Sequence, residues 1–191
     1  MRDPDIRKAL TTYLSALHAD QPETLFRHEL GLCSGERRID LAVLNGSITG
    51  YEIKSDVDTL MRLSGQADVY NQVLDYATVV TTARYIEKAT ALLPSWWGVI
   101  LAQSLDREVA LTEVRPMTRN VEHSPMALAQ LLWRDEALNE LRCRNAARGF
   151  AKKARWYVWE RLIEVVPLDE LRDVVRERLK AREDWQGGQP M

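Results

Sequence analysis

The feature that most constrains the fold is a short stretch, residues 36–54, in which two strand-like runs flank an Asn-Gly pair. Apolar residues dominate both runs, Ile39 to Leu44 and Ile48 to Lys54. Between them, Asn45-Gly46 is the strongest short-range signal for a β-hairpin that a sequence offers. The sequence therefore predicts two antiparallel strands joined by a tight turn.

Three charged side chains lie within this predicted hairpin. Asp40 interrupts the first apolar run, and Glu52 and Lys54 share one face of the second because they are two residues apart. Two ionised carboxylates about 4 Å apart repel by roughly 4 kcal/mol at an effective dielectric of about 20, and burial adds a desolvation cost. A divalent cation with oxygen ligands neutralises both acids. We therefore predict Mg²⁺ or Mn²⁺ at Asp40 and Glu52, with Lys54 orienting a water for attack on phosphorus.

The register of the hairpin decides whether the two acids share a face. With a two-residue turn, the numbers of facing residues sum to 91, and Asp40 and Glu52 then point to opposite faces. Both acids can bind one ion only if the numbers of facing residues have an even sum, as when Asp40 faces Glu52. The sequence therefore predicts a three-residue turn or a β-bulge, with Gly46 or Gly50 as its place.

A helix is expected directly after the hairpin, with Asp58 as its N-cap. Its apolar stripe at helical spacing comprises Leu60, Leu63, Ala67, Tyr70 and Leu74. Gln66 and Tyr70 are four residues apart and therefore lie on one face of this helix.

These residues carry a family resemblance. Asp40 followed, after eleven residues, by Glu52-Ile53-Lys54 resembles the D…(D/E)xK signature of the PD-(D/E)XK nuclease superfamily, the restriction-endonuclease-like fold. Gln66-Ala-Asp-Val-Tyr70 resembles the QxxxY motif of its RecB-like branch. The resemblance covers roughly residues 20–115, and the whole chain is similar to a little-characterised bacterial family that joins such a core to a helical tail.

The resemblance implies a set of functional residues. It implies that Glu29 and the carbonyl of Ile53 complete the metal shell, and that Gln66 and Tyr70 orient Lys54 or the scissile phosphate. The implied reaction is Mg²⁺-dependent hydrolysis of DNA phosphodiester bonds, leaving a 5′-phosphate and a 3′-hydroxyl. The resemblance suggests a role in DNA repair, in a phage or in defence. For Lys54 the plain alternative is a surface residue at the strand end with Glu52 as its cross-strand partner, and for Asp40 a side chain hydrogen-bonded to a loop.

Hydrophobic patterning predicts the rest of the core. Helices are expected at residues 4–19 and 84–93, and strands at 25–32, 76–82, 96–101 and 109–114. The order helix, strand, strand, strand, helix, strand is the αβββαβ order of the restriction-endonuclease-like fold, with a central mixed sheet flanked by helices. We therefore expect an α/β core at residues 1–115.

A helical extension is expected beyond a linker at residues 116–125, which contains Pro116 and Pro125. Its predicted helices cover roughly 126–142, 149–165 and 168–182, so the extension spans 126–186 and ends in a frayed Gly187-Gly188 segment.

The extension contains a basic and aromatic stretch without an acid, residues 142–159. Its members are Arg142, Arg144, Arg148, Lys152, Lys153, Arg155, Trp156, Tyr157 and Trp159. Such a stretch can neutralise phosphates and stack on exposed bases, so Arg148, Lys152, Lys153 and Arg155 are candidate nucleic-acid contacts. The alternative is a solvated helix face whose tryptophans belong to the core.

Composition sets the remaining bounds. The formal net charge of −2 provides no global basic field, so any contact with nucleic acid must be local. Cys33 and Cys143 have no CxxC or zinc-like spacing and suit a reducing compartment, so a cytoplasmic protein without a membrane segment is expected. The main rival to a DNA nuclease is a catalytically silent module of the same fold that binds nucleic acid or protein. The protein could form a homo-oligomer. An enzyme that acts on another phosphoryl substrate is poorly supported, because the sequence has no GxxxxGK[ST] loop.

Overall fold

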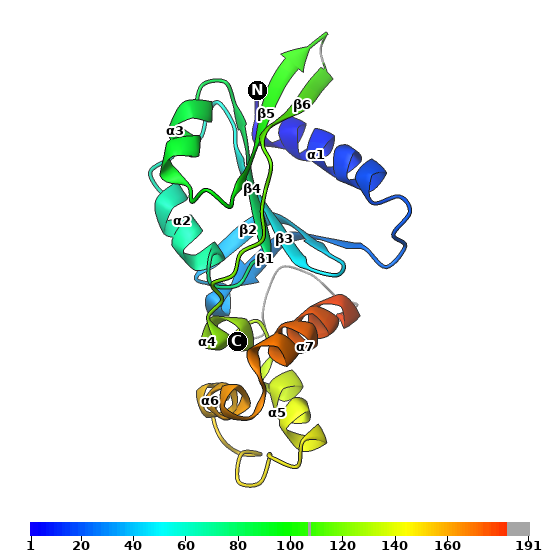
Figure 1. Ribbon diagram of the computed structural model, residues 1–191, viewed down its shortest axis with the longest axis vertical. Coiled ribbons are helices and arrows are strands. Elements are labelled where there is room, and N and C mark those ends of the chain that lie inside the picture. Colours follow the sequence, from blue (N-terminus) through cyan, green and yellow to red (C-terminus); the bar gives the residue numbers. More distant parts are fainter. Residues whose placement is uncertain (107, 183–191) are drawn as a thin grey trace.

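The computed structural model describes residues 1–106 and 108–182. Within them, one six-stranded mixed sheet has seven α-helices around it, which confirms the expected α/β class with a central mixed sheet and C-terminal helices (Figure 1). The strands are β1 (Leu25–Leu32), β2 (Arg37–Leu44), β3 (Ile48–Lys54), β4 (Tyr76–Thr82), β5 (Gly98–Leu105) and β6 (Glu108–Arg115). The helices are α1 (Asp3–Leu17), α2 (Leu63–Tyr70), α3 (Ile86–Leu92), α4 (Pro125–Ala129), α5 (Arg134–Cys143), α6 (Arg155–Val165) and α7 (Leu168–Ala181).

The strands follow one another across the sheet in chain order. β1, β2 and β3 are antiparallel, β3, β4 and β5 are parallel, and β6 is antiparallel to β5. The parallel strands need crossovers, and α2 and α3 provide them on one side of the sheet, whereas α1 covers the other side (Figure 1). The predicted αβββαβ order is thus present as α1, β1, β2, β3, α2 and β4.

The β2–β3 hairpin has the predicted even register. Its pairs run from Leu44 and Ile48 to Leu41 and Tyr51, and their residue numbers sum to 92. The turn therefore comprises three residues, Asn45, Gly46 and Ser47, and is closed by the side chain of Asn45, which accepts the backbone N–H of Ser47 at 3.1 Å. The prediction of a three-residue turn is confirmed.

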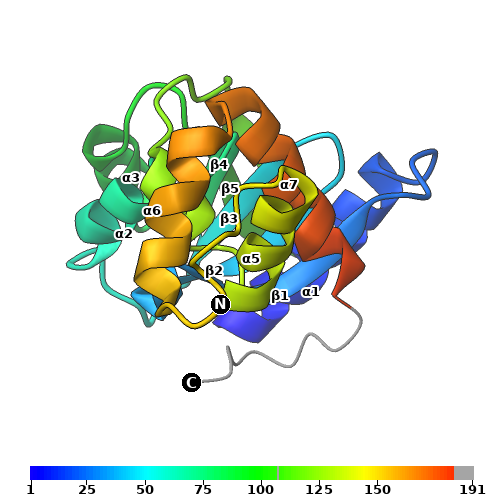
Figure 2. The ribbon, with the colours of Figure 1, turned by 90° about the horizontal axis from the view of Figure 1, so that it is seen from below.

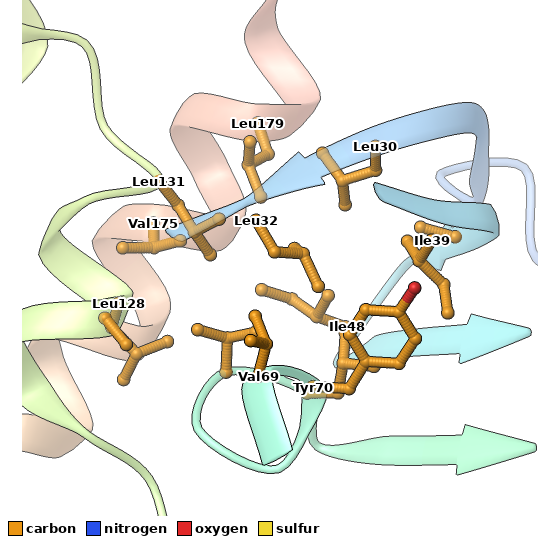
Figure 3. Close-up of a cluster of buried hydrophobic side chains, with 14 of the residues drawn as sticks. Leu30, Leu32, Ile39, Ile48, Val69, Tyr70, Leu128, Leu131, Val175 and Leu179 are labelled. Carbon is orange, nitrogen blue, oxygen red and sulfur yellow. The ribbon is translucent and has the colours of Figure 1, made fainter. Parts of the chain in front are cut away.

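The two faces of the sheet have separate hydrophobic clusters. On the α1 side, Ile6, Leu10 and Leu14 pack with residues of the sheet such as Val43 and Ile53. The cluster on the other side continues from the sheet and α2 into the C-terminal helices. Figure 3 shows this continuity, with Leu30, Ile48 and Tyr70 of the core facing Leu128 and Val175 of the extension. The helical extension therefore shares a hydrophobic cluster with the sheet, while its predicted division from the core stays a prediction.

Several predicted element bounds are wrong. Asp58 is not the N-cap of α2, which begins only at Leu63, because the Asp58 carboxylate is bonded to the backbone N–H and hydroxyl of Ser55 at 2.8 and 2.5 Å. The helix expected at 126–142 is two helices, α4 and α5. The helix expected at 149–165 begins at Arg155, so residues 149–154 form a loop. Residues 183–186 of the predicted extension and its predicted frayed end lie outside the described residues.

No helix within the described ranges is long and apolar enough to cross a membrane.

Candidate functional site

The charged residues of the hairpin form a buried cluster with α2. Glu52 is 2% exposed and Lys54 6% exposed, and their charged groups are 2.5 Å apart. The same Glu52 oxygen accepts the Gln66 amide at 2.5 Å, and its second oxygen accepts the Tyr70 hydroxyl at 2.9 Å. The structure therefore brings together four of the residues that the sequence selected, and both oxygens of the carboxylate have donors.

The pKa values of this cluster reflect its burial. Burial, followed by the nearby charge of Asp40, raises the pKa of Glu52, while Lys54 and Tyr70 act in the lowering direction. Burial and the charge of Glu52 also raise the pKa of the Tyr70 hydroxyl. Lys54 supplies the positive charge that compensates Glu52, and the two side chains form a buried ion pair.

Asp40 lies in a different set of contacts. One of its oxygens accepts Arg7 of α1 at 2.9 Å, and the other accepts the backbone N–H of Ile53 at 2.7 Å. The strand pairing of β2 with β3 ends at Leu41 and Tyr51, just before this point, so the carboxylate replaces a ladder partner for Ile53. The register is the one that places Asp40 and Glu52 on the same face of the hairpin, as predicted. The Asp40 carboxylate nevertheless accepts hydrogen bonds from Arg7 and from the backbone of Ile53.

Glu29 is a neighbour of Asp40 through the same arginine. Its carboxylate lies 3.3 Å from Arg7, and its φ of 54° is in the left-handed region, which is uncommon for a residue other than glycine. The strand changes face there: Phe26 packs with the α1-side cluster, whereas Leu30 belongs to the cluster on the α2 side. Glu29 thus marks an irregularity in β1 that turns its later residues towards α2.

Arg7 is the residue of this cluster that sequence reasoning missed. It contacts Asp3, Glu29 and Asp40, and although burial lowers its pKa, its contacts with Asp3 and Asp40 raise that pKa overall. The i,i+4 spacing of Asp3 and Arg7 is a signal for that one pair. No local signal joins Arg7 to Asp40, which is 33 residues away.

The carboxylates of the predicted metal site are held by other side chains in this structure. Arg7 holds Glu29 and Asp40, while Lys54, Gln66 and Tyr70 hold Glu52. Among residues 1–106 and 108–182, no three His, Cys, Asp or Glu side chains are grouped so that they could hold an ion. The predicted Mg²⁺ or Mn²⁺, with Ile53 as a carbonyl ligand, stays a prediction.

The predicted nucleic-acid contacts lie elsewhere, between α5 and α6. Arg148, Lys152, Lys153 and Arg155, here called the basic surface, all have exposed side chains. The loop that carries three of them lies at the end of the molecule furthest from the sheet (Figure 1), and α6 begins beside α5 when seen from below (Figure 2).

Other members of the predicted basic and aromatic stretch have structural roles. Arg144 is paired with Glu140 and Glu170, at 2.5 and 3.3 Å. Trp159 is 3% exposed and donates its indole N–H to the carbonyl of Leu132 at 3.2 Å. The alternative interpretation is confirmed for Trp159, which is part of the packed helices, but not for Trp156, which is exposed. Contact between the basic surface and nucleic acid stays a prediction.

The fold and these two clusters define an α/β protein with a self-neutralised polar cluster on its sheet and a basic surface on a helical extension. A family model described as Bacteriophage P4 protein cII matches residues 1–186. The chain belongs to this family.

Two individual proteins are similar to this chain. Protein cII of Enterobacteria phage P4 is 30% identical over 109 residues, which are 57% of this chain and 41% of the phage protein. The match therefore spans less than half the length of that relative. A solved structure, a protein of unknown function from Silicibacter pomeroyi, has 16% identity and a TM-score of 0.40 over 73% of this chain and 91% of its own.

Family membership overturns the enzymatic prediction. The chain is a member of the protein cII family, and no PD-(D/E)XK nuclease family is found, so the assignment to that superfamily is wrong. The predictions of a Mg²⁺-dependent nuclease and DNA hydrolase are wrong with it. The catalytic roles given to Asp40, Glu52, Lys54, Gln66 and Tyr70 depended on that assignment and are not retained. A strand acid, an ExK strand and a following helix can arise for structural reasons, as the contacts of Asp40 and Lys54 illustrate.

Proposed function

We propose that this protein binds nucleic acid through the basic surface and does not cut it. The observation that carries the proposal is a run of four exposed cations in eight residues, 148–155, without an acid among them. Within the described part of the chain, none of the four forms an ion pair with a carboxylate. Cations that are free of carboxylate partners can neutralise backbone phosphates and release their counterions.

The backbone of this loop is fixed by Arg134. Its guanidinium, at the start of α5, donates to the carbonyl of Lys153 at 3.0 Å and to that of Ala151 at 2.6 Å. Gly149 has a φ of 86°, a conformation that only glycine adopts without strain. Because the backbone is held in this way, binding would order little more than the long side chains, which lowers its entropic cost.

The contrast with Arg144 supports a binding role for the basic surface. Arg144 lies in the same stretch of sequence and is held by two carboxylates, whereas Arg148 and the two lysines are exposed and form no ion pair with a carboxylate of the described residues. Since the whole chain carries a formal charge of −2, attraction to a polyanion must come from a local surface such as this one.

We further propose that this binding takes place in the cytoplasm. Cys33 and Cys143 are both free thiols, which is the ordinary state of cysteines in a reducing compartment.

The test is a comparison of two double variants by fluorescence anisotropy with a labelled oligonucleotide. Lys152→Ala/Lys153→Ala removes two cations of the basic surface. Lys8→Ala/Lys88→Ala removes two exposed lysines from α1 and α3 and changes the net charge equally. Since each phosphate contact contributes a salt exponent of about 0.7 to 0.9, the first variant should bind about 25- to 60-fold more weakly at about 0.1 M salt. The control variant should bind like the unmodified protein.

Two results would overturn the proposal. One is an equal loss of affinity, or no loss, in the two variants, because the basic surface would then make no specific contribution. The other is equally tight binding of a polyaspartate peptide of similar charge, which would point to an acidic protein partner instead of nucleic acid.

A further inference from the structure

We infer that the nucleic acid held by the basic surface is single-stranded, with unpaired bases stacked on Trp156 and Tyr157. The inference rests on the proposed function, since it names the form of nucleic acid that the same surface takes. Both aromatic residues directly follow the four cations in the chain and lie in the first turn of α6.

The exposure of the two rings sets them apart from the core aromatic residues. Trp156 is 48% exposed and Tyr157 is 52% exposed, whereas Trp159, on the same helix, is buried. The packing of α6 against the other helices is supplied by Val158, Trp159 and Leu162, so it does not need the two exposed rings. Two large aromatic side chains left open beside a cationic loop are suited to a ligand that offers flat faces and negative charge together.

Both rings are held in position by polar contacts. The indole N–H of Trp156 donates to Glu160 at 2.6 Å, and the ammonium of Lys153 lies over the Tyr157 ring at 5.4 Å from its centre. The Lys153 contact places a phosphate-binding group beside a stacking surface. A base that stacks on this face of Tyr157 displaces the ammonium, which can then pair with the phosphate of the same nucleotide.

The charges along α6 argue against a duplex. A helix that reads a duplex lies in the major groove, between two phosphate backbones. Beyond its first turn, α6 carries Glu160 and the exposed Glu164, which would face phosphates in such a groove. The cations of the basic surface are confined to the loop and the start of the helix, and Arg161 further along α6 is already paired with Glu164 at 2.9 Å. A duplex also hides its base faces within the stack. A single strand crossing the end of α6 satisfies the cations and both rings.

The experiment compares a labelled 12-nucleotide single strand with a duplex of the same sequence. We expect the single strand to bind at least about tenfold more tightly. Stacking adds roughly 5- to 150-fold in affinity per base, so Trp156→Ala/Tyr157→Ala should lose at least about tenfold for the single strand and little for the duplex. Trp156→Phe/Tyr157→Phe keeps both rings and should retain most of the affinity. Circular dichroism establishes that each variant is folded.

The outcomes separate this inference from the proposed function. Duplex binding as tight as single-strand binding, with no effect of the alanine variant on either form, overturns the inference, while sensitivity to Lys152→Ala/Lys153→Ala still supports nucleic-acid binding. Loss of duplex binding in the alanine variant also overturns it, because the rings would then act as wedges between paired bases. An unmodified protein that binds neither form overturns both proposals.

Discussion

The buried ion pair of Glu52 and Lys54 provides a quantitative test of the interpretation that the polar cluster is neutralised internally. The two charged groups are 2.5 Å apart and both side chains are almost fully buried. Their Coulomb attraction is about 7 kcal/mol at an effective dielectric of about 20, and it offsets a desolvation cost of several kcal/mol for each ion. Removing one partner leaves the other charge buried without compensation.

We expect Lys54→Met and Glu52→Gln each to lower the free energy of unfolding by about 3–5 kcal/mol. The double variant, which removes both charges, should lie within about 1–2 kcal/mol of the unmodified protein. Urea unfolding, followed by circular dichroism, measures these differences as shifts of the midpoint at an unchanged slope.

The pH dependence of Lys54→Met gives a second view of the same cluster. Burial and the charge of Asp40 raise the pKa of Glu52, so the folded state takes up a proton more readily than the unfolded state does. The penalty in Lys54→Met should therefore shrink as the pH falls from 7 towards 5. Additive losses in the double variant, with no dependence on pH, would refute the idea that the two charges compensate each other.

Three further predictions concern the fold. Gly98→Ala should lower the free energy of unfolding by about 1–3 kcal/mol, because the new Cβ would lie 2.5 Å from the Thr78 hydroxyl and 3.1 Å from the Met117 backbone nitrogen; Gly46→Ala, where the space is open, is the control in the same urea experiment. Burial, against the opposing charge of Asp75, lowers the pKa of His123, so the unfolded chain takes up a proton near pH 6.5 before the folded one does. Stability should then fall by up to about 1.4 kcal/mol per pH unit below that pH, and His123→Gln should remove this part of the pH profile, which an unchanged profile would contradict. Asp75→Ala should cost about 3–5 kcal/mol, since it removes the acceptor of the Ile48 backbone N–H and the buried partner of Arg172 of α7, which then keeps the exposed Asp169 at 3.5 Å. A thermal midpoint equal to that of the unmodified protein would contradict this.

The regular elements of the core were predictable because their patterns are local. A run of β-branched residues predicts β4 at residues 76–82, and the structure has the same bounds. The even register of the hairpin followed from asking that Asp40 and Glu52 share a face, and the observed sum of 92 agrees. The Asn45 side chain, which accepts the Ser47 N–H, explains why an Asn-Gly sequence here forms a three-residue turn.

The predicted helix bounds in the extension are wrong where a side chain binds the backbone carbonyls that a helix would use. Residues 149–154 have helical composition, but Gly149 at positive φ and the two carbonyls held by Arg134 keep them in a loop. The hydrogen bonds come from a residue that is distant in sequence, and the positive φ is a property of one residue. Hydrophobic periodicity predicts neither of them. The basic surface is exposed for this reason.

The functional prediction failed because a motif fixes residue types and spacing and leaves the partners of those residues open. The prediction that Glu52, Lys54, Gln66 and Tyr70 lie together is correct, as their hydrogen bonds demonstrate. Its interpretation as a nuclease centre is overturned by membership of the protein cII family. Arg7, the cation that holds Asp40, comes from a helix 33 residues upstream, and no motif includes it.

Binding of nucleic-acid phosphates by the four cations of the basic surface is tested most directly by the salt dependence of the affinity. Four phosphate contacts predict a slope of log affinity against log salt between about −2.8 for a single strand and about −3.6 for a duplex. Between 50 and 200 mM salt, the affinity should therefore fall by about 50- to 150-fold. The Lys152→Ala/Lys153→Ala variant should show about half that slope. A slope near zero, or the same slope in that variant, would contradict the account.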